Sequence, residues 1–236
     1  RFRLGSITKQ FTAMLTLQLV EQGKIKLDGK ITDYLPDYRK DIGEKVTIHH
    51  LLTHTSGLPD YTDGMLDYRR AYAESDLVKF AYGLTLEFAP GERWKYSNTG
   101  YVMLGALVRK VTGRFYGDVV RDGVFLPLDM GSARIISEVD IVPHRAAGYR
   151  LVDGVVKNQE WVSPELNTTA DGSYYISLRD MVAWDAGLRA GALLDAASWD
   201  QVFSPVRLNS GETHPYGFGW SVEPLDGHRA QRHSGG

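Results

Sequence analysis

The sequence predicts an α+β protein in which helices and loops dominate and strand signals collect near the C-terminal end. Apolar residues recur every three or four positions at 7–20, 101–111 and 181–188, which indicates helices. Aromatic residues alternate with other residues over 216–222, which indicates a strand. The 236 residues can form one large domain or two small ones.

The first helical segment follows Gly5. Its apolar residues have the spacing of a helix with one buried face, and they are Ile7, Phe11, Met14, Leu15, Leu19 and Val20. Gly23 is expected to end this helix in a left-handed conformation. Ser6 then lies at the helix N-terminus with Lys9 one turn later on the same side, so the pair is a candidate activated serine nucleophile. Alone, such a pair is more often a helix cap beside a solvated lysine.

Later helices are predicted from residues that favour the capping position. The predicted caps are Thr47 for a helix over 48–52, Ser75 for 76–82, Asn98 for a helix that Gly113 ends, Ser177 for a helix up to Leu188, and Asp195 for a helix up to Phe203. Residues 31–36 are expected to be short and irregular. Residues 132–160 alternate only weakly, and Val155 and Val156 are their best strand candidates.

The composition narrows the classes of partner. The formal net charge is −2 and the basic residues are scattered, so we expect no nucleic acid partner. No apolar run is as long as a membrane-spanning helix. The chain has no Cys, which excludes disulfides and thiolate chemistry.

Other kinds of site have weak signals. The spacing of His49, His50, His54, Asp60 and Asp63 matches no known metal motif, so we expect no metal. No glycine-rich phosphate loop and no Gly-x-Ser-x-Gly elbow is present, so nucleotide binding and an α/β-hydrolase triad are not expected.

Two further motifs could complete a serine site. Tyr96 and Asn98 stand two residues apart at the start of a predicted helix, and His233 precedes two glycines after the predicted 216–222 strand. A Tyr hydroxyl normally titrates near pH 10, so acid–base catalysis by Tyr96 at neutral pH would need a lowered pKa of this hydroxyl. The positive charge of Lys9 is expected to supply that effect. Each motif is weak alone, and their combination is what points to catalysis.

With these motifs the sequence resembles the penicillin-recognising serine hydrolases. This β-lactamase-like and penicillin-binding-protein family has a branch with class C β-lactamases, DD-carboxypeptidases, D-aminopeptidases and esterases, in which Ser-x-x-Lys, Tyr-x-Asn and Lys/His-x-Gly recur. The most specific matching stretches are 51–59, Leu-Leu-Thr-His-Thr-Ser-Gly-Leu-Pro, and 90–101, which contains Pro-Gly-Glu-Arg-Trp-Lys-Tyr-Ser-Asn. Residues 177–181 and 216–220 match more loosely.

The resemblance implies a role for each motif. Ser6 would be the acylated nucleophile, and Lys9 and Tyr96 would share its proton and pass it to the leaving group. Asn98 would bind the acyl side chain of the substrate and orient Lys9.

The third motif would line the pocket with His233, Ser234 and Gly235. The backbone N–H groups of Ser6 and Gly236 would form the oxyanion hole. The substrate would be a small molecule or short peptide, and no cofactor is implied.

The resemblance also implies the fold. It is the β-lactamase/transpeptidase-like fold, an antiparallel sheet flanked by helices beside a mainly helical region. We expect a nucleophile helix at the domain interface over 1–26, the helical region over 27–170, and a return to the α/β region over 171–236. Terminal strands of the family are expected to be missing from this chain, so we expect that it would not fold alone.

Departures from the family pattern bear on the function. His233 stands where class C β-lactamases usually have lysine, which favours an esterase, a D-amino-acid peptidase or a DD-carboxypeptidase over a class C-like β-lactamase. Gly172, Ser173 and Tyr174 stand where the family usually has a small Gly-Gly-Leu turn, and a bulkier residue there is expected to narrow or reshape the pocket. A catalytically inactive binding or scaffold homologue is the alternative of another class. Family habit favours a bacterial periplasmic or secreted location.

Overall fold

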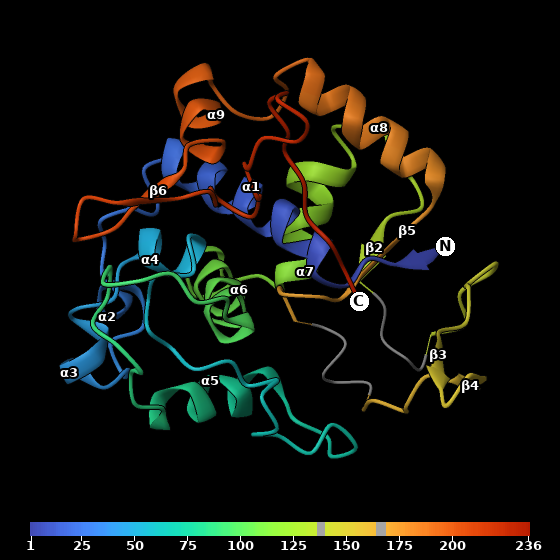
Figure 1. Ribbon diagram of the computed structural model, residues 1–236, viewed down its shortest axis with the longest axis horizontal. Helices are drawn as coiled ribbons and strands as arrows, with labels where there is room; N and C mark the ends of the chain where they lie inside the picture. The colour runs from blue at the N-terminus through green and yellow to red at the C-terminus, as the bar shows by residue number, and fades with distance from the viewer. Residues whose placement is uncertain (136–139, 164–168) are drawn as a thin grey trace.

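The computed structural model describes residues 1–135, 140–163 and 169–236, in which a short antiparallel sheet lies at one side of a mainly helical body (Figure 1). The helical elements are η1 (Gly5–Ile7), α1 (Thr8–Glu21), α2 (Ile31–Tyr34), α3 (Lys40–Gly43), α4 (Ile48–Leu52), α5 (Glu74–Gly83), α6 (Asn98–Thr112), α7 (Tyr116–Val120), η2 (Arg121–Phe125), α8 (Leu178–Arg189) and α9 (Ala196–Val202). The strands are β1 (Phe2–Arg3), β2 (Arg134–Ile135), β3 (Tyr149–Val152), β4 (Val155–Asn158), β5 (Tyr174–Ile176), β6 (Val206–Arg207) and β7 (Thr213–His214).

The main sheet has the antiparallel order β1-β5-β2. Its central strand β5 is buried throughout and pairs Tyr175 with Arg3 on one side and with Arg134 on the other. The predicted strand at Val155 and Val156 is confirmed as β4, which forms a hairpin with β3. Antiparallel strands joined through one buried central strand hold both edges of the sheet in register.

Helix α1 runs through the middle of the molecule, between α6 on one side and α8 and α9 on the other (Figure 1). The prediction of a single buried face is wrong, because nearly every residue from Thr8 to Leu19 is buried. Polar side chains tolerate this burial because the backbone accepts their hydrogens. The Thr12 hydroxyl, for example, donates to the Ala170 carbonyl oxygen at 2.6 Å. Gly23 ends the segment with a φ of +68°, as predicted.

Helix starts follow the predicted capping residues in most cases. Thr47, Ser177 and Asp195 each accept a backbone N–H of their own helix and are confirmed as caps. Two predictions are wrong by one or two positions. Ser97, not Asn98, caps α6, and the residue before α5 is Ala73. The shift at α6 matters because it frees the Asn98 side chain for other contacts.

The strand predicted over 216–222 is wrong. Tyr216 forms an isolated bridge with Ser221, and Gly219 between them has a φ of +79°. The alternating aromatics are buried, but they belong to a tight turn packed against α1. A Cβ at Gly219 would lie 2.8 Å from the Lys9 carbonyl oxygen, so only glycine allows this approach.

The division into 1–26, 27–170 and 171–236 stays a prediction. Residues 136–139, within the weakly alternating 132–160 segment, lie outside the described residues. Within the described ranges, none of the helices combines the length and the apolar character needed to cross a bilayer.

Phe11 provides a test of the core around α1. Its ring is fully buried, stacks on Trp184 at 4.2 Å between centroids and meets Tyr174 and Phe125 edge-on. We expect Phe11→Ala to lower the free energy of unfolding by about 3–5 kcal/mol, because it leaves a cavity. Urea denaturation of the full-length protein measures this change. Leu126→Ala, at a side chain that is 61% exposed, should change it by less than about 0.5 kcal/mol.

Candidate active site

Ser6 lies in the short turn η1, directly before α1 and against the end of the described chain. Gly5 has a φ of +53°, and a Cβ there would lie 2.5 Å from the Gly236 carbonyl oxygen and 2.7 Å from its nitrogen. A Cβ at Gly235 would overlap the Leu4 carbonyl oxygen. Figure 1 shows the same proximity, with the C-terminal end beside the N-terminal strand. The two glycines therefore bring the third motif within reach of Ser6.

Lys9 is the centre of the hydrogen-bond network. Its side chain has no exposed surface. The amino nitrogen Nζ lies 3.2 Å from Ser6 Oγ, 2.6 Å from Asn98 Oδ1 and 2.9 Å from the Asp171 carbonyl oxygen. These three oxygens account for the three hydrogens of an ammonium group.

Burial lowers the pKa of Lys9 from 10.5 to about 8. The carboxylates of Asp171 and Asp60 act in the opposite direction, because negative charge favours the ammonium form. A pKa of about 8 leaves roughly a tenth of the amine neutral at pH 7. The amine is therefore available as a proton acceptor near neutral pH.

Asn98 connects Lys9 to a buried carboxylate. Its Oδ1 accepts from Lys9, while its Nδ2 donates to Asp60 Oδ2 at 2.9 Å. Asp60 in turn accepts the backbone N–H of Thr62 at 3.0 Å. Sequence reasoning weighed Asp60 only as a metal ligand and missed this role. Its position one residue after the specific 51–59 stretch is the signal that could have found it.

Asp171 was also missed by sequence reasoning. It offers its carbonyl oxygen to Lys9, and its Oδ2 accepts from the Tyr61 hydroxyl at 2.7 Å. The side chain is 4% exposed, and its Oδ1 has no hydrogen-bond partner within the ranges that the structure describes. No local pattern distinguishes this residue, because its role depends on contacts across the fold.

Tyr96 lies beside Lys9, whose Nζ is 4.9 Å from the ring centroid. The predicted lowering of the Tyr96 pKa is wrong. Burial raises it well above 10, the Ser6 hydroxyl opposes that rise, and the charges of Asp171 and Asp60 add to it. The hydroxyl is buried, and no described group meets it with normal hydrogen-bond geometry. Tyr96 is therefore a neutral phenol with a hydrogen to donate.

His233 reaches the site from the chain end. Its ring centroid is 6.1 Å from that of Tyr96. Its Nε2 lies 3.0 Å from the Tyr216 hydroxyl, and its Nδ1 lies 2.6 Å from the Ser234 carbonyl oxygen. Burial lowers the pKa of His233 and the Lys9 charge adds to this, while the Ser234 carbonyl raises it. The His233 ring is therefore neutral, and both of its nitrogens form hydrogen bonds.

A pocket of about 210 Å³ opens at Ser6. Asn98, Asp171, Gly172 and Gly236 line it together with Arg3, Gly5, Tyr61, Thr62, Tyr68 and Val162. Of the turn at 172–174, only Gly172 lines the pocket, and the predicted narrowing by Ser173 or Tyr174 is wrong because both side chains are buried away from it. Tyr174 instead packs edge-on against Phe11 in the core.

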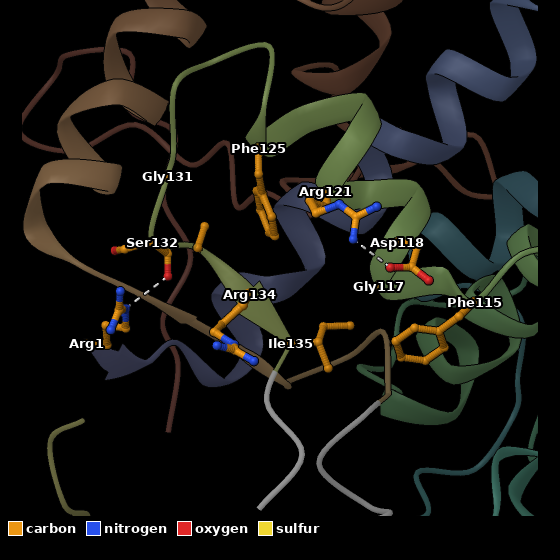
Figure 2. A pocket seen from close by; sticks show the side chains of 11 residues that line it. Arg1, Phe115, Gly117, Asp118, Arg121, Phe125, Gly131, Ser132, Arg134 and Ile135 are labelled. Atoms are coloured by element: carbon orange, nitrogen blue, oxygen red, sulfur yellow. Dashed lines mark hydrogen bonds and ion pairs between the residues drawn. The ribbon is translucent and has the colours of Figure 1, made fainter. Parts of the chain in front are cut away.

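Another cavity, of about 320 Å³, contains none of the predicted site residues (Figure 2). Three arginines line it, yet each is engaged. Arg1 donates to the Ser132 carbonyl oxygen, Arg121 pairs with Asp118 at 2.9 Å, and Arg134 pairs with Asp140 at 3.0 Å. In the described part of the chain, no cluster of His, Asp or Glu has an arrangement that could hold a metal ion.

The chain belongs to the beta-lactamase family, because the family model described as Beta-lactamase matches residues 1–236. It is 36% identical over 256 residues to a penicillin-binding protein of Bacillus subtilis strain 168, covering 100% of this chain and 55% of that protein. It is also 36% identical over 154 residues to esterase EstB of Burkholderia gladioli, covering 58% of this chain and 38% of the esterase.

A D-stereospecific amidohydrolase from Streptomyces sp. has a similar structure. The TM-score is 0.85 at 30% identity, and the match covers 99% of this chain and 74% of that chain. The similarity confirms the predicted β-lactamase/transpeptidase-like fold. The chain spans about half the length of the Bacillus relative, 55%.

The charge balance around Lys9 can be tested directly. Because the Asp60 carboxylate raises the pKa of Lys9, we expect Asp60→Asn to move that pKa below about 8. An NMR titration of ¹³C-labelled Lys9 Cε in the full-length protein measures the shift. Asp63→Asn, at an exposed carboxylate nearby in sequence, should leave the value unchanged. A rise in the pKa of Asp60→Asn would contradict this account.

Proposed function

We propose that this chain carries the site of a serine hydrolase that works through an acyl-enzyme on a small ester or amide. One observation carries the proposal, namely the buried Lys9 amine 3.2 Å from Ser6 Oγ. A nucleophile within hydrogen-bond reach of a base that is itself held by further groups is the general arrangement of activated serines.

The hydrogen bonds of Lys9 support its role as the base. A neutral amine has two N–H donors and one lone pair. The Asn98 amide oxygen and the Asp171 carbonyl oxygen take the two hydrogens, so the lone pair points to the remaining partner, the Ser6 hydroxyl. Deprotonated Lys9 therefore accepts from Ser6, with no rearrangement of its other two bonds.

The proposed acylation follows from this geometry. Ser6 Oγ attacks the substrate carbonyl carbon while its proton passes to Lys9. The N–H groups of Ser6 and Gly236 stabilise the oxyanion. Tyr96, a neutral phenol, donates its proton to the departing alcohol or amine as the acyl bond breaks, and the Lys9 proton restores the phenol. Water then hydrolyses the acyl ester on Ser6, and the same groups transfer the protons in the reverse order.

The substrate class is proposed from the relatives. The names of the esterase and the D-stereospecific amidohydrolase support an ester or a D-amino-acid amide. His233 is neutral and supplies no fixed positive charge for the carboxylate of a β-lactam, so a class C-like β-lactamase is the second candidate. An inactive scaffold homologue is less well supported, because Ser6, Lys9, Tyr96 and Asn98 are all in place. An envelope or secreted location stays a prediction.

Covalent labelling of Ser6 tests the proposed function. We expect the full-length protein to form one adduct with a fluorophosphonate, which intact-protein mass spectrometry detects, and Ser6→Ala to form none. Ser210→Ala, at an exposed serine, should label as the wild type does. A short-chain aryl ester and a D-amino-acid amide should be turned over faster than a penicillin. An adduct retained in Ser6→Ala, or none in the wild type, would reject the proposal.

The oxyanion hole can be tested through the glycine contact behind it. Gly235→Ala places a methyl group against the Leu4 carbonyl and should displace Gly236 from Ser6. We expect the labelling rate of Ser6 to fall about a hundredfold or more, as when one oxyanion donor is lost. Gly83→Ala, where a Cβ meets nothing within 4 Å, is the matched control and should keep the wild-type rate. Equal rates in the two variants would exclude Gly236 as a donor.

A further inference from the structure

A continuous line of hydrogen bonds runs behind the proposed site from Ser97 to Ser234. The Ser97 backbone N–H lies 3.1 Å from His54 Nδ1, and His54 Nε2 lies 3.2 Å from the Tyr216 hydroxyl. That hydroxyl lies 3.0 Å from His233 Nε2, and His233 Nδ1 lies 2.6 Å from the Ser234 carbonyl oxygen. The segments that carry His54 and His233 thus meet at the hydroxyl of Tyr216.

The direction of the line is fixed at its Ser97 end. A backbone N–H can only donate, so His54 Nδ1 is an acceptor. The His54 ring is fully buried, and burial holds its pKa well below 6.5, so the ring is neutral. A neutral imidazole with an acceptor at Nδ1 carries its hydrogen on Nε2. His54 therefore donates to the Tyr216 oxygen.

The other end fixes the remaining bonds. A carbonyl oxygen can only accept, so His233 Nδ1 carries a hydrogen and donates to Ser234. Neutral His233 then has a lone pair on Nε2, which the Tyr216 hydroxyl meets with its hydrogen. The adjacent Tyr101 gives its hydroxyl hydrogen to the Leu52 carbonyl oxygen at 2.8 Å, so it can meet Tyr216 only as an acceptor. Of the two acceptors, His233 Nε2 is the one that lies at hydrogen-bond distance with normal geometry.

We propose that Tyr216 is a positioning residue of this site, which donates to His233 Nε2, accepts from His54 Nε2, and so ties the His233 ring to the segment that carries Tyr96 and Asn98. The proposal rests on the proposed hydrolase function. Tyr216 acts through His233 and has no assigned contact with the substrate. Its hydroxyl is the only described group that bridges the two imidazoles.

The packing around the line shows how such positioning would reach the reacting groups. The His54 ring lies against the Tyr96 ring, with centroids 4.2 Å apart, so a shift of one moves the other. Tyr216 itself starts the tight turn in which Gly219 touches the α1 backbone at Lys9. Losing the Tyr216 hydroxyl would therefore loosen His233 relative to both Tyr96 and Lys9.

The first measurement determines which ring nitrogen of His233 carries the hydrogen. A free neutral imidazole in water favours the hydrogen on Nε2, so an Nδ1–H tautomer reports the bound arrangement. Long-range ¹H–¹⁵N spectra of ¹⁵N-histidine-labelled full-length protein, assigned with a His233→Gln variant, distinguish the two forms. We expect Nδ1–H in the wild type, and in Tyr216→Phe a shifted Nε2 resonance, because that nitrogen loses its hydrogen-bond donor while the Ser234 carbonyl still accepts from Nδ1. The wild-type spectrum needs no variant of Tyr216 to decide the hydrogen-bond direction.

The labelling rate of Ser6 is the second measurement. We expect Tyr216→Phe to slow fluorophosphonate labelling by about ten- to a hundredfold, the usual effect of a small misplacement in a site. Tyr38→Phe is the matched control, because it removes an equally buried hydroxyl that donates to the Ala81 carbonyl oxygen elsewhere in the core. That variant should keep both the wild-type rate and the wild-type His233 spectrum.

The outcomes separate the two proposals. A wild-type His233 with its hydrogen on Nε2 overturns the inference, as does a Tyr216→Phe variant with unchanged rate and spectrum. In either case a labelled Ser6 leaves the proposed hydrolase function standing. If the wild-type Ser6 takes up no reagent, the hydrolase proposal fails and this positioning role fails with it.

Discussion

The burial of the Lys9 amine is the constraint on which the site depends. A lysine with no exposed surface is costly unless its hydrogens have acceptors and its charge has counter-charges. Ser6, Asn98 and the Asp171 carbonyl provide the acceptors, and the carboxylates of Asp60 and Asp171 provide the charge. The same burial lowers the pKa of Lys9 to about 8. One physical effect thus explains both the surrounding polar residues and the availability of a base.

The position of α1 follows from this constraint. To bury Lys9 in its first turn, the helix has to be covered on all sides, and chain segments have to approach its backbone closely. Gly219 lies against the Lys9 carbonyl, and Gly5 and Gly235 allow the third motif to reach Ser6. Side chains at these positions would force the segments apart. The glycines therefore set the geometry of the site as much as the polar residues do.

Signals that act within one or two helical turns were readable from the sequence. Gly23 and Gly113 end their helices in left-handed conformations, and Ser177 caps α8, because these preferences are local. Ser6, Lys9 and Asn98 were predicted as site residues from their combined motifs and the family resemblance, and the structure brings their side chains together. The pKa of Tyr96 and the contact of Asp171 with Lys9 were not readable from the sequence, because both depend on charges and carbonyls that only the fold brings together.

His233, in the third motif, is consistent with the balance between the charge of Lys9 and the carboxylates of Asp60 and Asp171. Arg3 and Asp171 line the pocket, and the carboxylates of Asp171 and Asp60 oppose the positive charge of Lys9 behind it. A lysine at position 233 would add a positive charge and, by repulsion, lower the pKa of Lys9 further. Neutral His233, held by Tyr216, fills the same place without that effect. Such a site has little attraction for an anionic substrate, which agrees with the proposal of an ester or amide substrate over a carboxylate-bearing β-lactam.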